Sequence, residues 1–152
     1  MTTSIEKLRQ LGYELPVARA PVASYLPVLR VGNLLYISGQ VSSDDNGVVT
    51  GRVGDTMNVV QGANAAELAA VNVLAQIVHN GGIALEAVKR VVKLTVFVAS
   101  TPEFAEQHLV ANGGSNLLVG VLGDKGKHAR SAIGVAALPL GAAVEIEAVI
   151  EL

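Results

Sequence analysis

The segment from His128 to Leu152 constrains the fold most, because its second half alternates between apolar and mostly acidic residues. One face would carry Val144, Ile146, Ala148, Ile150 and Leu152, and the other Glu145, Glu147, Val149 and Glu151. A period of two residues is typical of a β-strand with one face in a hydrophobic core. The sequence therefore predicts a half-buried strand at the end of the chain.

The first half of the same segment predicts a second strand, which forms a hairpin with the last one through a turn at Leu138–Gly141. Pairing apolar with apolar residues places Ile133 and Val135 on the core face. The opposite face, shared with the glutamates, would then carry Arg130, Ala132, Gly134 and Ala136. We expect this face, with small residues between opposite charges, to leave room for a small ligand.

The N-terminal part predicts a helical extension over residues 1–20. Thr3 and Glu6 form a capping-box pattern, and Gly12 is a typical helix stop. We expect this short amphipathic helix to pack over the rest of the domain. The prolines that follow, Pro16, Pro21 and Pro27, predict an extended or looping stretch.

The middle of the chain predicts two strands, about 27–31 and 34–41, then a helix from Asn58 to His79 and a buried strand over 88–98. A second helix is expected to begin at Thr101-Pro102 and to reach about residue 122, with a break at Gly113-Gly114. This order predicts one α+β domain over 1–152. Its architecture would be a two-layer sandwich, with a mixed or antiparallel sheet and two long helices on one face.

Composition limits the partners of such a domain. The chain is 51% hydrophobic with 16% charged residues, and its mean hydropathy is +0.47. No apolar run approaches the roughly 20 residues of a membrane span, so the surplus apolar surface favours contact with other copies of the chain. The net charge of −2 and the absence of a basic stripe argue against nucleic acid as a partner.

Several classes of chemistry lack their usual residues. With no cysteine there is no disulfide or thiolate. His79, His108 and His128 do not have the spacing of metal ligands, and no phosphate-binding or dinucleotide-binding glycine motif is present, so we expect neither a metal nor a cofactor. Residues 2–15 lack the pattern of a signal peptide, and a cytoplasmic location is the default expectation.

Arg130 and Glu145 are the main candidates for chemistry. A guanidinium can bind a carboxylate through two parallel hydrogen bonds, which suits a small carboxylate substrate. Glu145, on the neighbouring predicted strand, could act as a general acid or base or hold a water molecule. From spacing alone, an ordinary cross-strand ion pair between Arg130 and a glutamate is the favoured explanation.

Five short motifs add to this interpretation. They are Asn33–Gln40 (NLLYISGQ), Val92–Val98 (VKLTVFV), Ala129–Ser131 (ARS), Ala136–Pro139 (AALP) and Val144–Ala148 (VEIEA). With them the chain resembles the Rid (YjgF-like) family, also called the L-PSP endoribonuclease family, from about Pro21 to the C-terminus. The resemblance implies a chorismate-mutase-like fold that assembles as a homotrimer with clefts between subunits.

The resemblance also implies an activity and a set of residues. The activity is cofactor-free hydrolysis of small enamines and imines, such as 2-aminoacrylate and 2-iminopropanoate, to 2-keto acids and ammonia, as in a 2-iminobutanoate/2-iminopropanoate deaminase. Arg130 would pair with the substrate carboxylate, and Glu145 would lie near the attacking water. Residues at matching positions that line the same cleft are Tyr25, Ser38, Asn112 and Ala132.

Some departures and alternatives stay open. Ala132 stands where the deaminase branch commonly has cysteine, and the segment 106–127 differs from that branch, so the cleft is expected to be reshaped. Tyr25 could instead be a packing residue, Ser38 a hydroxyl bonded to backbone, and Asn112 a helix cap. A non-catalytic binder of small carboxylates such as 2-keto acids is the alternative function, and an endoribonuclease is a third, weaker one.

Overall fold

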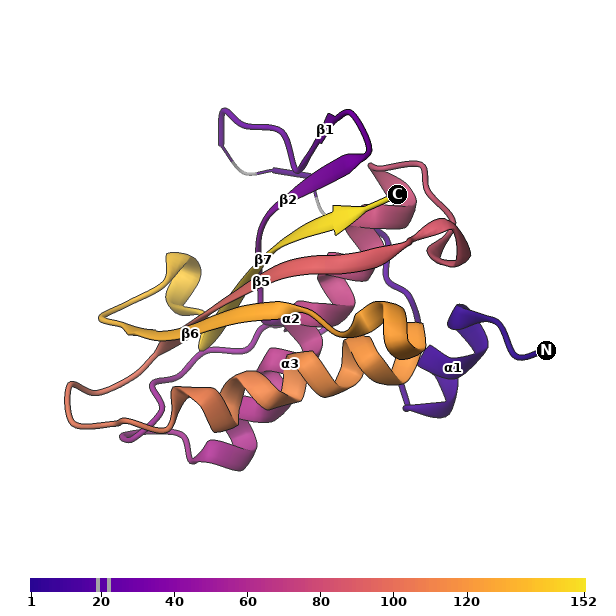
Figure 1. The fold of residues 1–152 in the computed structure, drawn as a ribbon. Helices are drawn as coiled ribbons and strands as arrows, with labels where there is room; N and C mark the ends of the chain where they lie inside the picture. Colours follow the sequence, from indigo (N-terminus) through magenta and orange to yellow (C-terminus); the bar gives the residue numbers. More distant parts are fainter. Residues whose placement is uncertain (19, 22) are drawn as a thin grey trace.

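The computed structural model describes residues 1–18, 20–21 and 23–152. Its main sheet contains five strands in the order β1-β2-β7-β5-β6. Their bounds are β1 Val28–Val31, β2 Leu34–Val41, β5 Arg90–Ala99, β6 Ala129–Val135 and β7 Val144–Glu151. Two long helices, α2 (Val59–His79) and α3 (Gln107–Leu122), lie together on one face of this sheet (Figure 1). The predicted α+β two-layer sandwich with a mixed sheet is confirmed.

The core lies between the sheet and helix α2. Most of the inward side chains of α2 are alanine or branched aliphatic residues with almost no exposed surface, among them Ala66, Ala69, Val73, Leu74 and Ile77. They pack on the apolar faces of the strands, including Leu94, Val96 and Ile146. Because alanine is small, α2 lies close to the sheet along its length, and the capping box of Asn58 and Gln61 begins it where the sequence predicts.

Helix α3 is continuous, and the predicted break at Gly113-Gly114 is wrong. A Cβ atom at Gly113 would lie 2.1 Å from the carbonyl oxygen of Ala63, and one at Gly114 would lie 2.8 Å from Ile146 Cδ1. The glycine pair therefore serves the close contact of α3 with α2 rather than a bend. Glycine costs about 1 kcal/mol of helix propensity at each position, and the tertiary contact outweighs that cost.

The predicted C-terminal hairpin is also wrong. Strand β6 pairs in parallel with β5, and β5 pairs antiparallel with β7, so β5 separates the two strands (Figure 1). Alternation of apolar and polar residues identifies a strand and its two faces, but it does not show which strand pairs with it in the sheet. β5 takes the position next to β7 because its inward residues Leu94, Val96 and Val98 are fully buried, which a central strand requires.

The two faces of β6 are the reverse of the prediction. Arg130 pairs with Leu94 in the register and therefore lies on the helix side, whereas Ile133 is 44% exposed on the open side. Small residues face the helices because α3 comes close: a Cβ atom at Gly134 would lie 2.7 Å from Gln107 Nε2. Their small size thus reflects helix packing, and Arg130 does not share a face with Glu145.

The N-terminal helix α1 (Ser4–Gln10) has the predicted capping box between Thr3 and Glu6. Its Leu8 is fully buried, and the backbone N–H of Ser4 donates to the carboxylate of Glu86 at 2.8 Å. After the helix, the hydroxyl of Tyr13 donates to Glu67 on α2. These contacts hold the extension against the domain, as expected.

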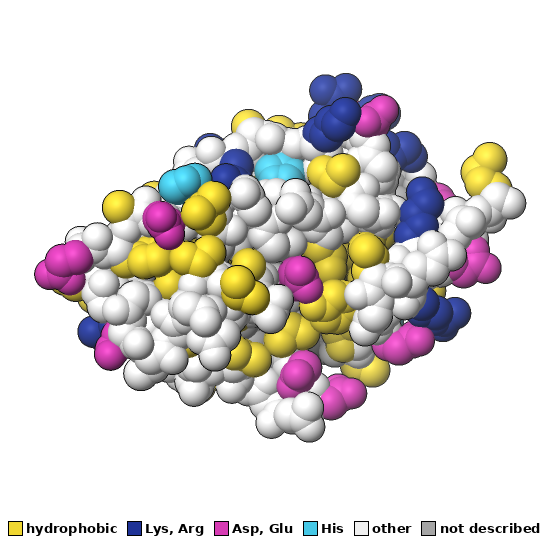
Figure 2. All heavy atoms as spheres, turned by 90° about the horizontal axis from the view of Figure 1, so that it is seen from below, with side chains coloured by type: hydrophobic (Ala, Val, Ile, Leu, Met, Phe, Trp, Pro, Cys, Tyr) yellow, Lys and Arg dark blue, Asp and Glu magenta, His cyan; other side chains and the backbone are white. Residues whose placement is uncertain are grey.

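Minor elements complete the chain: β3 (Ser43–Asp44), β4 (Gly47–Val48), and the short helices η1 (Leu85–Ala87), η2 (Gly123–Gly126) and η3 (Pro139–Gly141). Among the described residues, no helix is long and apolar enough to cross a membrane. On the helix side, charges of both signs are interspersed with exposed apolar side chains (Figure 2).

The uncovered face of the sheet exposes large apolar side chains. Leu29 is 51% exposed, Tyr36 45% and Ile133 44%. All three project from the sheet away from the helices, because a sequence neighbour of each packs in or against the core on the other face: Val28, Leu35 and Ala132. An exposed apolar sheet face of this kind commonly marks a surface for protein contact.

We predict that Gly113→Ala destabilises the protein by about 1–3 kcal/mol, because the added Cβ overpacks the contact with the backbone of α2. Gly120→Ala is the matched control. Its Cβ would meet only the end of the Leu11 side chain, so it should be neutral or gain up to about 1 kcal/mol. Urea unfolding at a fixed chain concentration measures both, and equal effects of the two substitutions would contradict the helix contact.

Candidate functional site

Arg130 is held on the helix side of β6 by three neutral acceptors. Its Nη1 donates to Asn112 Oδ1 at 2.9 Å and to Ser115 Oγ at 3.1 Å, and its Nη2 donates to the carbonyl oxygen of His108 at 3.2 Å. All three acceptors belong to α3, whose glycine pair lies between Asn112 and Ser115. The close packing of α3 on α2 therefore positions the residues that hold the guanidinium.

His128 fixes the orientation of the Ser115 hydroxyl. Its Nδ1 lies 2.6 Å from the carbonyl oxygen of Gly126, which can only accept, so Nδ1 carries the proton of the neutral ring. Nε2 then accepts from Ser115 Oγ at 2.9 Å. The hydroxyl proton is used in this bond, and the oxygen lone pairs are left for Arg130. We call Arg130, Asn112, Ser115 and His128 the Arg130 cluster.

Arg130 forms no ion pair within the described residues, so the cross-strand ion pair favoured from spacing is wrong. A guanidinium has five N–H donors; three of them are used by α3, which leaves Nε–H and one Nη2–H. Two such donors suit the two oxygens of a carboxylate. The cluster is therefore a half-buried cation whose orientation is fixed and whose charge is not neutralised by a nearby acid.

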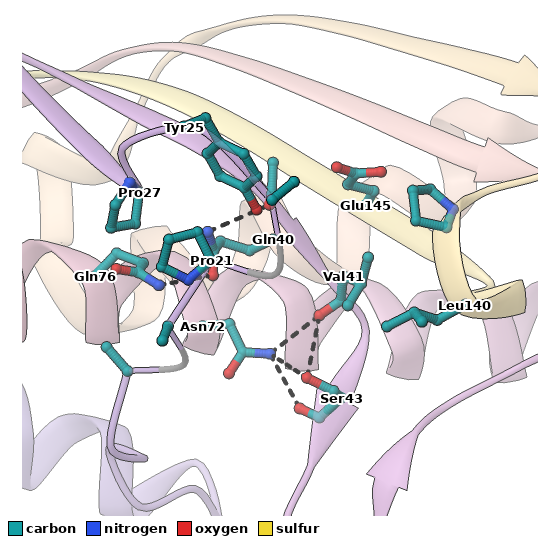
Figure 3. Close-up of a pocket in the computed structure, with 15 residues that line it drawn as sticks. Pro21, Tyr25, Pro27, Gln40, Val41, Ser43, Asn72, Gln76, Leu140 and Glu145 are labelled. Atoms are coloured by element: carbon teal, nitrogen blue, oxygen red, sulfur yellow. Dashed lines mark hydrogen bonds between the residues drawn. The ribbon is translucent and has the colours of Figure 1, made fainter.

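A cavity of about 410 Å³ lies at the β2 border of the sheet. Strand β1 covers β2 only as far as Ile37, so the rest of β2 is open on that side. The cavity is lined by β2, by α2, by the turn before β7 and by described residues that precede β1, among them Pro21, Tyr25 and Pro27 (Figure 3). Tyr25 and Glu145 both line it, and we call it the Glu145 cavity.

Glu145 is a half-buried carboxylate with no hydrogen bond or ion pair to the described residues. Burial raises the pKa of its carboxyl group above the usual value, and the neighbouring charge of Glu147 raises it further. The side chain leans across Gly39 of β2, where a Cβ atom would lie 2.0 Å from Glu145 Oε1. Glycine at position 39 is thus needed to leave space for the carboxylate beside the cavity.

The remaining candidates occupy different places. Ser38 donates its hydroxyl to the carbonyl oxygen of Leu26 at 2.7 Å, which agrees with the alternative of a backbone-bonded hydroxyl. Asn112 lies inside α3 and is not a helix cap. Ala132 follows Arg130 on the same side of β6 and packs on the core. Ala132 does not line the Glu145 cavity.

Within one chain four of the six candidates therefore form two separate groups, and Ser38 and Ala132 belong to neither. Arg130 and Asn112 meet in the Arg130 cluster at the β6 border, and Tyr25 and Glu145 share the cavity at the β2 border. Arg130 and Glu145 lie on opposite faces of the sheet, because their partners on β5, Leu94 and Phe97, do.

Sequence reasoning missed three residues of these sites: Ser115, His128 and Gly39. Ser115 follows Asn112 by three positions on α3, so the two share a helix face, and His128 stands two positions before Arg130, immediately ahead of β6. That spacing was the available signal, but the expected helix break at Gly113 separated Asn112 from Ser115. For Gly39, only the observed bulge of β2 reveals the need for a missing side chain.

No group of three or more histidine, aspartate or glutamate side chains in the described part of the chain could hold a metal ion. The two sites differ in what they can bind. The Arg130 cluster offers a fixed cation to an anion, whereas the Glu145 cavity offers apolar walls and a carboxylate that can hold a water molecule or exchange a proton.

We predict that the neutral imidazole of His128 carries its proton on Nδ1, because Gly126 offers only an acceptor. Long-range ¹H–¹⁵N spectra at alkaline pH measure the tautomer directly. Ser115→Ala serves as the control: it removes the partner of Nε2 but leaves Gly126, so the Nδ1–H form should persist. A proton on Nε2 in the unsubstituted protein would contradict the hydrogen-bond chain that orients Arg130.

Comparison with protein families gives a match to the model described as Endoribonuclease L-PSP over residues 16–152. The chain is 47% identical over 147 residues to protein TCP17 of Trypanosoma cruzi, which covers 95% of this chain and 91% of that protein. It is 29% identical to a 2-iminobutanoate/2-iminopropanoate deaminase of Dermatophagoides farinae, over 89% of this chain and 91% of that protein.

Among solved structures, the fold matches a crystal structure of a protein of unknown function from Agrobacterium tumefaciens. The TM-score is 0.92 at 49% sequence identity, and the match covers 98% of this chain and 92% of the other. The N-terminal extension is thus part of the shared fold, because nearly the whole chain superposes.

Proposed function

Since the chain belongs to the Endoribonuclease L-PSP family, we propose that it hydrolyses small 2-imino acids to 2-keto acids and ammonia, without a cofactor, where two copies of the chain meet. One copy would contribute the Arg130 cluster and the next copy the Glu145 cavity. The deaminase name of the Dermatophagoides farinae relative supports this class of substrate.

One observation carries the proposal: among the described residues, neither Arg130 nor Glu145 has an oppositely charged partner. Arg130 is oriented by neutral acceptors with two donors left over, and Glu145 is desolvated beside an open cavity. Leaving a charge desolvated and unpaired is costly. Both costs fall when a neighbouring copy brings the two groups to the same interface and a substrate bridges them.

The distance between the Arg130 cluster and Glu145, at opposite borders of the sheet, also limits how copies of the chain can assemble. A contact between the β6 border of one copy and the β2 border of the next uses two different surfaces, so it is heterologous. Such contacts form a closed ring when the rotation between copies closes, and the family resemblance supports a ring of three copies. The exposed apolar sheet face, with Leu29, Tyr36 and Ile133, supports burial inside such a ring.

The reaction needs little beyond positioning. In R–C(=NH)–COO⁻ + H₂O → R–CO–COO⁻ + NH₃, the imine carbon is already electrophilic. Arg130 would bind the carboxylate through Nε–H and Nη2–H, and fix the carbon relative to the next copy. Glu145 would accept a proton from the attacking water as the C–O bond forms, and return a proton to nitrogen as ammonia leaves. Orientation and fixed charges supply the rate enhancement.

A binder of small carboxylates that performs no chemistry is the second candidate, because Arg130 alone could carry it. The two candidate functions differ in their need for Glu145, which the hydrolase requires for proton transfer and the binder does not require. Calorimetry with pyruvate or 2-oxobutanoate on the unsubstituted protein and on Glu145→Gln separates them when it is combined with an imine assay. Binding without turnover favours the binder.

We predict that Arg130→Ala and Glu145→Gln each lower imine hydrolysis by about 10²–10⁴-fold, the range of a lost acid, base or positioning group. The assay uses an amino-acid oxidase to generate the imine and follows its decay. Arg90→Ala is the matched control: this exposed arginine of the same sheet pairs with Glu151 and should leave the rate unchanged. Equal decay with the unsubstituted protein and Arg130→Ala would remove the proposal.

Co-expression of the two inactive variants tests the shared site. An interface between the Glu145→Gln copy, which keeps Arg130, and the Arg130→Ala copy, which keeps Glu145, contains both groups. Random assembly should restore activity at about a quarter of the interfaces. Mixed oligomers isolated with two affinity tags that stay inactive would show that the site lies within one chain.

We predict further that Arg130→Ala raises the pKa of the Glu145 carboxyl group. Burial and Glu147 already raise this pKa within one chain, and a guanidinium across the interface favours the ionised form and lowers it. Carbon-13 NMR titration of the glutamate carboxyl groups measures the change, with Arg90→Ala as the control. The same Glu145 pKa in all three proteins would contradict an interface shared by Arg130 and Glu145.

A further inference from the structure

The Glu145 cavity is larger than the smallest substrates of the proposed reaction. Its volume is about 410 Å³, within the range of about 300–1,000 Å³ typical of small-molecule pockets. 2-Iminopropanoate is about as large as six waters, roughly 180 Å³ at about 30 Å³ each. More than half of the cavity would therefore stay empty beside a substrate with a methyl side chain.

The walls of this space are mostly apolar. Residues with apolar or aromatic side chains that line it include Pro21, Tyr25, Pro27, Val41, Pro139 and Leu140 (Figure 3). Such walls favour an apolar group over an empty space or disordered water.

The amides at the base of the cavity are already engaged within the protein. Gln76 Nε2 donates to Gln40 Oε1 at 3.1 Å, and Gln40 Nε2 donates to the carbonyl oxygen of Ser38 at 2.9 Å. Asn72 Nδ2 donates to the carbonyl oxygens of Val41 and Ser43. These side-chain donors are therefore satisfied without a polar ligand. Among the described lining residues, Glu145 alone carries a carboxylate.

Leu140 supplies a second, independent observation. Its φ is 61° and its ψ is 15°, a left-handed conformation, and no other described residue except glycine has a positive φ. The Cβ atom of any residue other than glycine clashes with the following carbonyl oxygen in this conformation, and residues held in it cluster at binding and active sites. Leu140 lines the Glu145 cavity, and its side chain is 64% exposed. The strained turn thus places an apolar side chain at the cavity where glycine or asparagine would be relaxed.

Resting on the proposed function, we propose that the cavity takes the side chain of the substrate and selects 2-imino acids with large apolar side chains, such as those formed from leucine, methionine or phenylalanine. The carboxylate would lie on Arg130 of the neighbouring copy, the imine carbon near Glu145, and the side chain between Tyr25 and Leu140. Tyr25 and Leu140 are then specificity-determining residues, because they contact the part of the substrate that differs between amino acids.

Each methylene buried in such a pocket contributes about a fourfold preference. The leucine-derived imine carries three more carbon atoms than the alanine-derived one. We therefore expect kcat/KM for the leucine-derived substrate to exceed that for the alanine-derived substrate by at least about tenfold. The same oxidase-coupled assay measures both, with the oxidase rate matched for the two amino acids.

Filling the cavity should reverse the preference. Leu140→Trp narrows it at an exposed position that tolerates a large side chain, and Val41→Phe narrows it from β2. Each should lower the ratio of the two kcat/KM values at least tenfold. Val60→Trp is the control, because Val60 is 68% exposed on α2 and does not line the cavity; the ratio should keep its original value.

The outcomes separate this inference from the proposed function. Equal or better hydrolysis of the alanine-derived imine overturns the selectivity and leaves the hydrolase intact. Absence of hydrolysis of every imine overturns the proposed hydrolase activity. Calorimetry then tests whether the cavity prefers large apolar side chains: tighter binding of 4-methyl-2-oxopentanoate than of pyruvate supports this preference, and equal binding overturns it. If the ratio of the two kcat/KM values is unchanged in both Leu140→Trp and Val41→Phe, the proposed selectivity of the cavity is also overturned.

Discussion

The close contact between α2 and α3 is the constraint on which the rest of the molecule depends. It requires glycine at positions 113 and 114, where any side chain would meet the backbone of α2 or the end of Ile146. The neighbours of this pair, Asn112 and Ser115, lie on the other side of α3 and hold the guanidinium of Arg130. A packing requirement in the core thus fixes the position of a cation at the surface, without any acid beside it.

The two candidate sites show how one sheet can carry complementary chemistry at its two borders. Parallel pairing puts β6 at one border with Arg130 directed to the helices, and the short β1 leaves β2 open at the other. The two borders complement each other: the first offers an oriented cation, and the second offers apolar walls and a carboxylate that forms no ion pair with the described residues. Assembly from identical copies is the simplest way to join them.

Local patterns predicted most elements of this fold, and tertiary packing decided what they left open. The strands, the capping boxes at Thr3 and Asn58 and the layer arrangement follow from alternation, helical periodicity and end signals. The predicted hairpin failed because periodicity contains no information about strand order. The faces of β6 were reversed because small residues were assigned to a ligand, whereas they admit α3. Residue types pointed to Arg130 and Glu145, but the cluster around Arg130 depends on contacts that no local pattern encodes.

The left-handed backbone at Leu140 has a consequence for engineering. A residue without a Cβ atom would relax that turn, so Leu140→Gly is an obvious choice for raising the melting temperature of the protein. The same change would remove an apolar side chain from the mouth of the Glu145 cavity. With the side-chain selectivity proposed for this cavity, thermal stability and ligand discrimination would compete at this one position, and selection for one alone would erode the other.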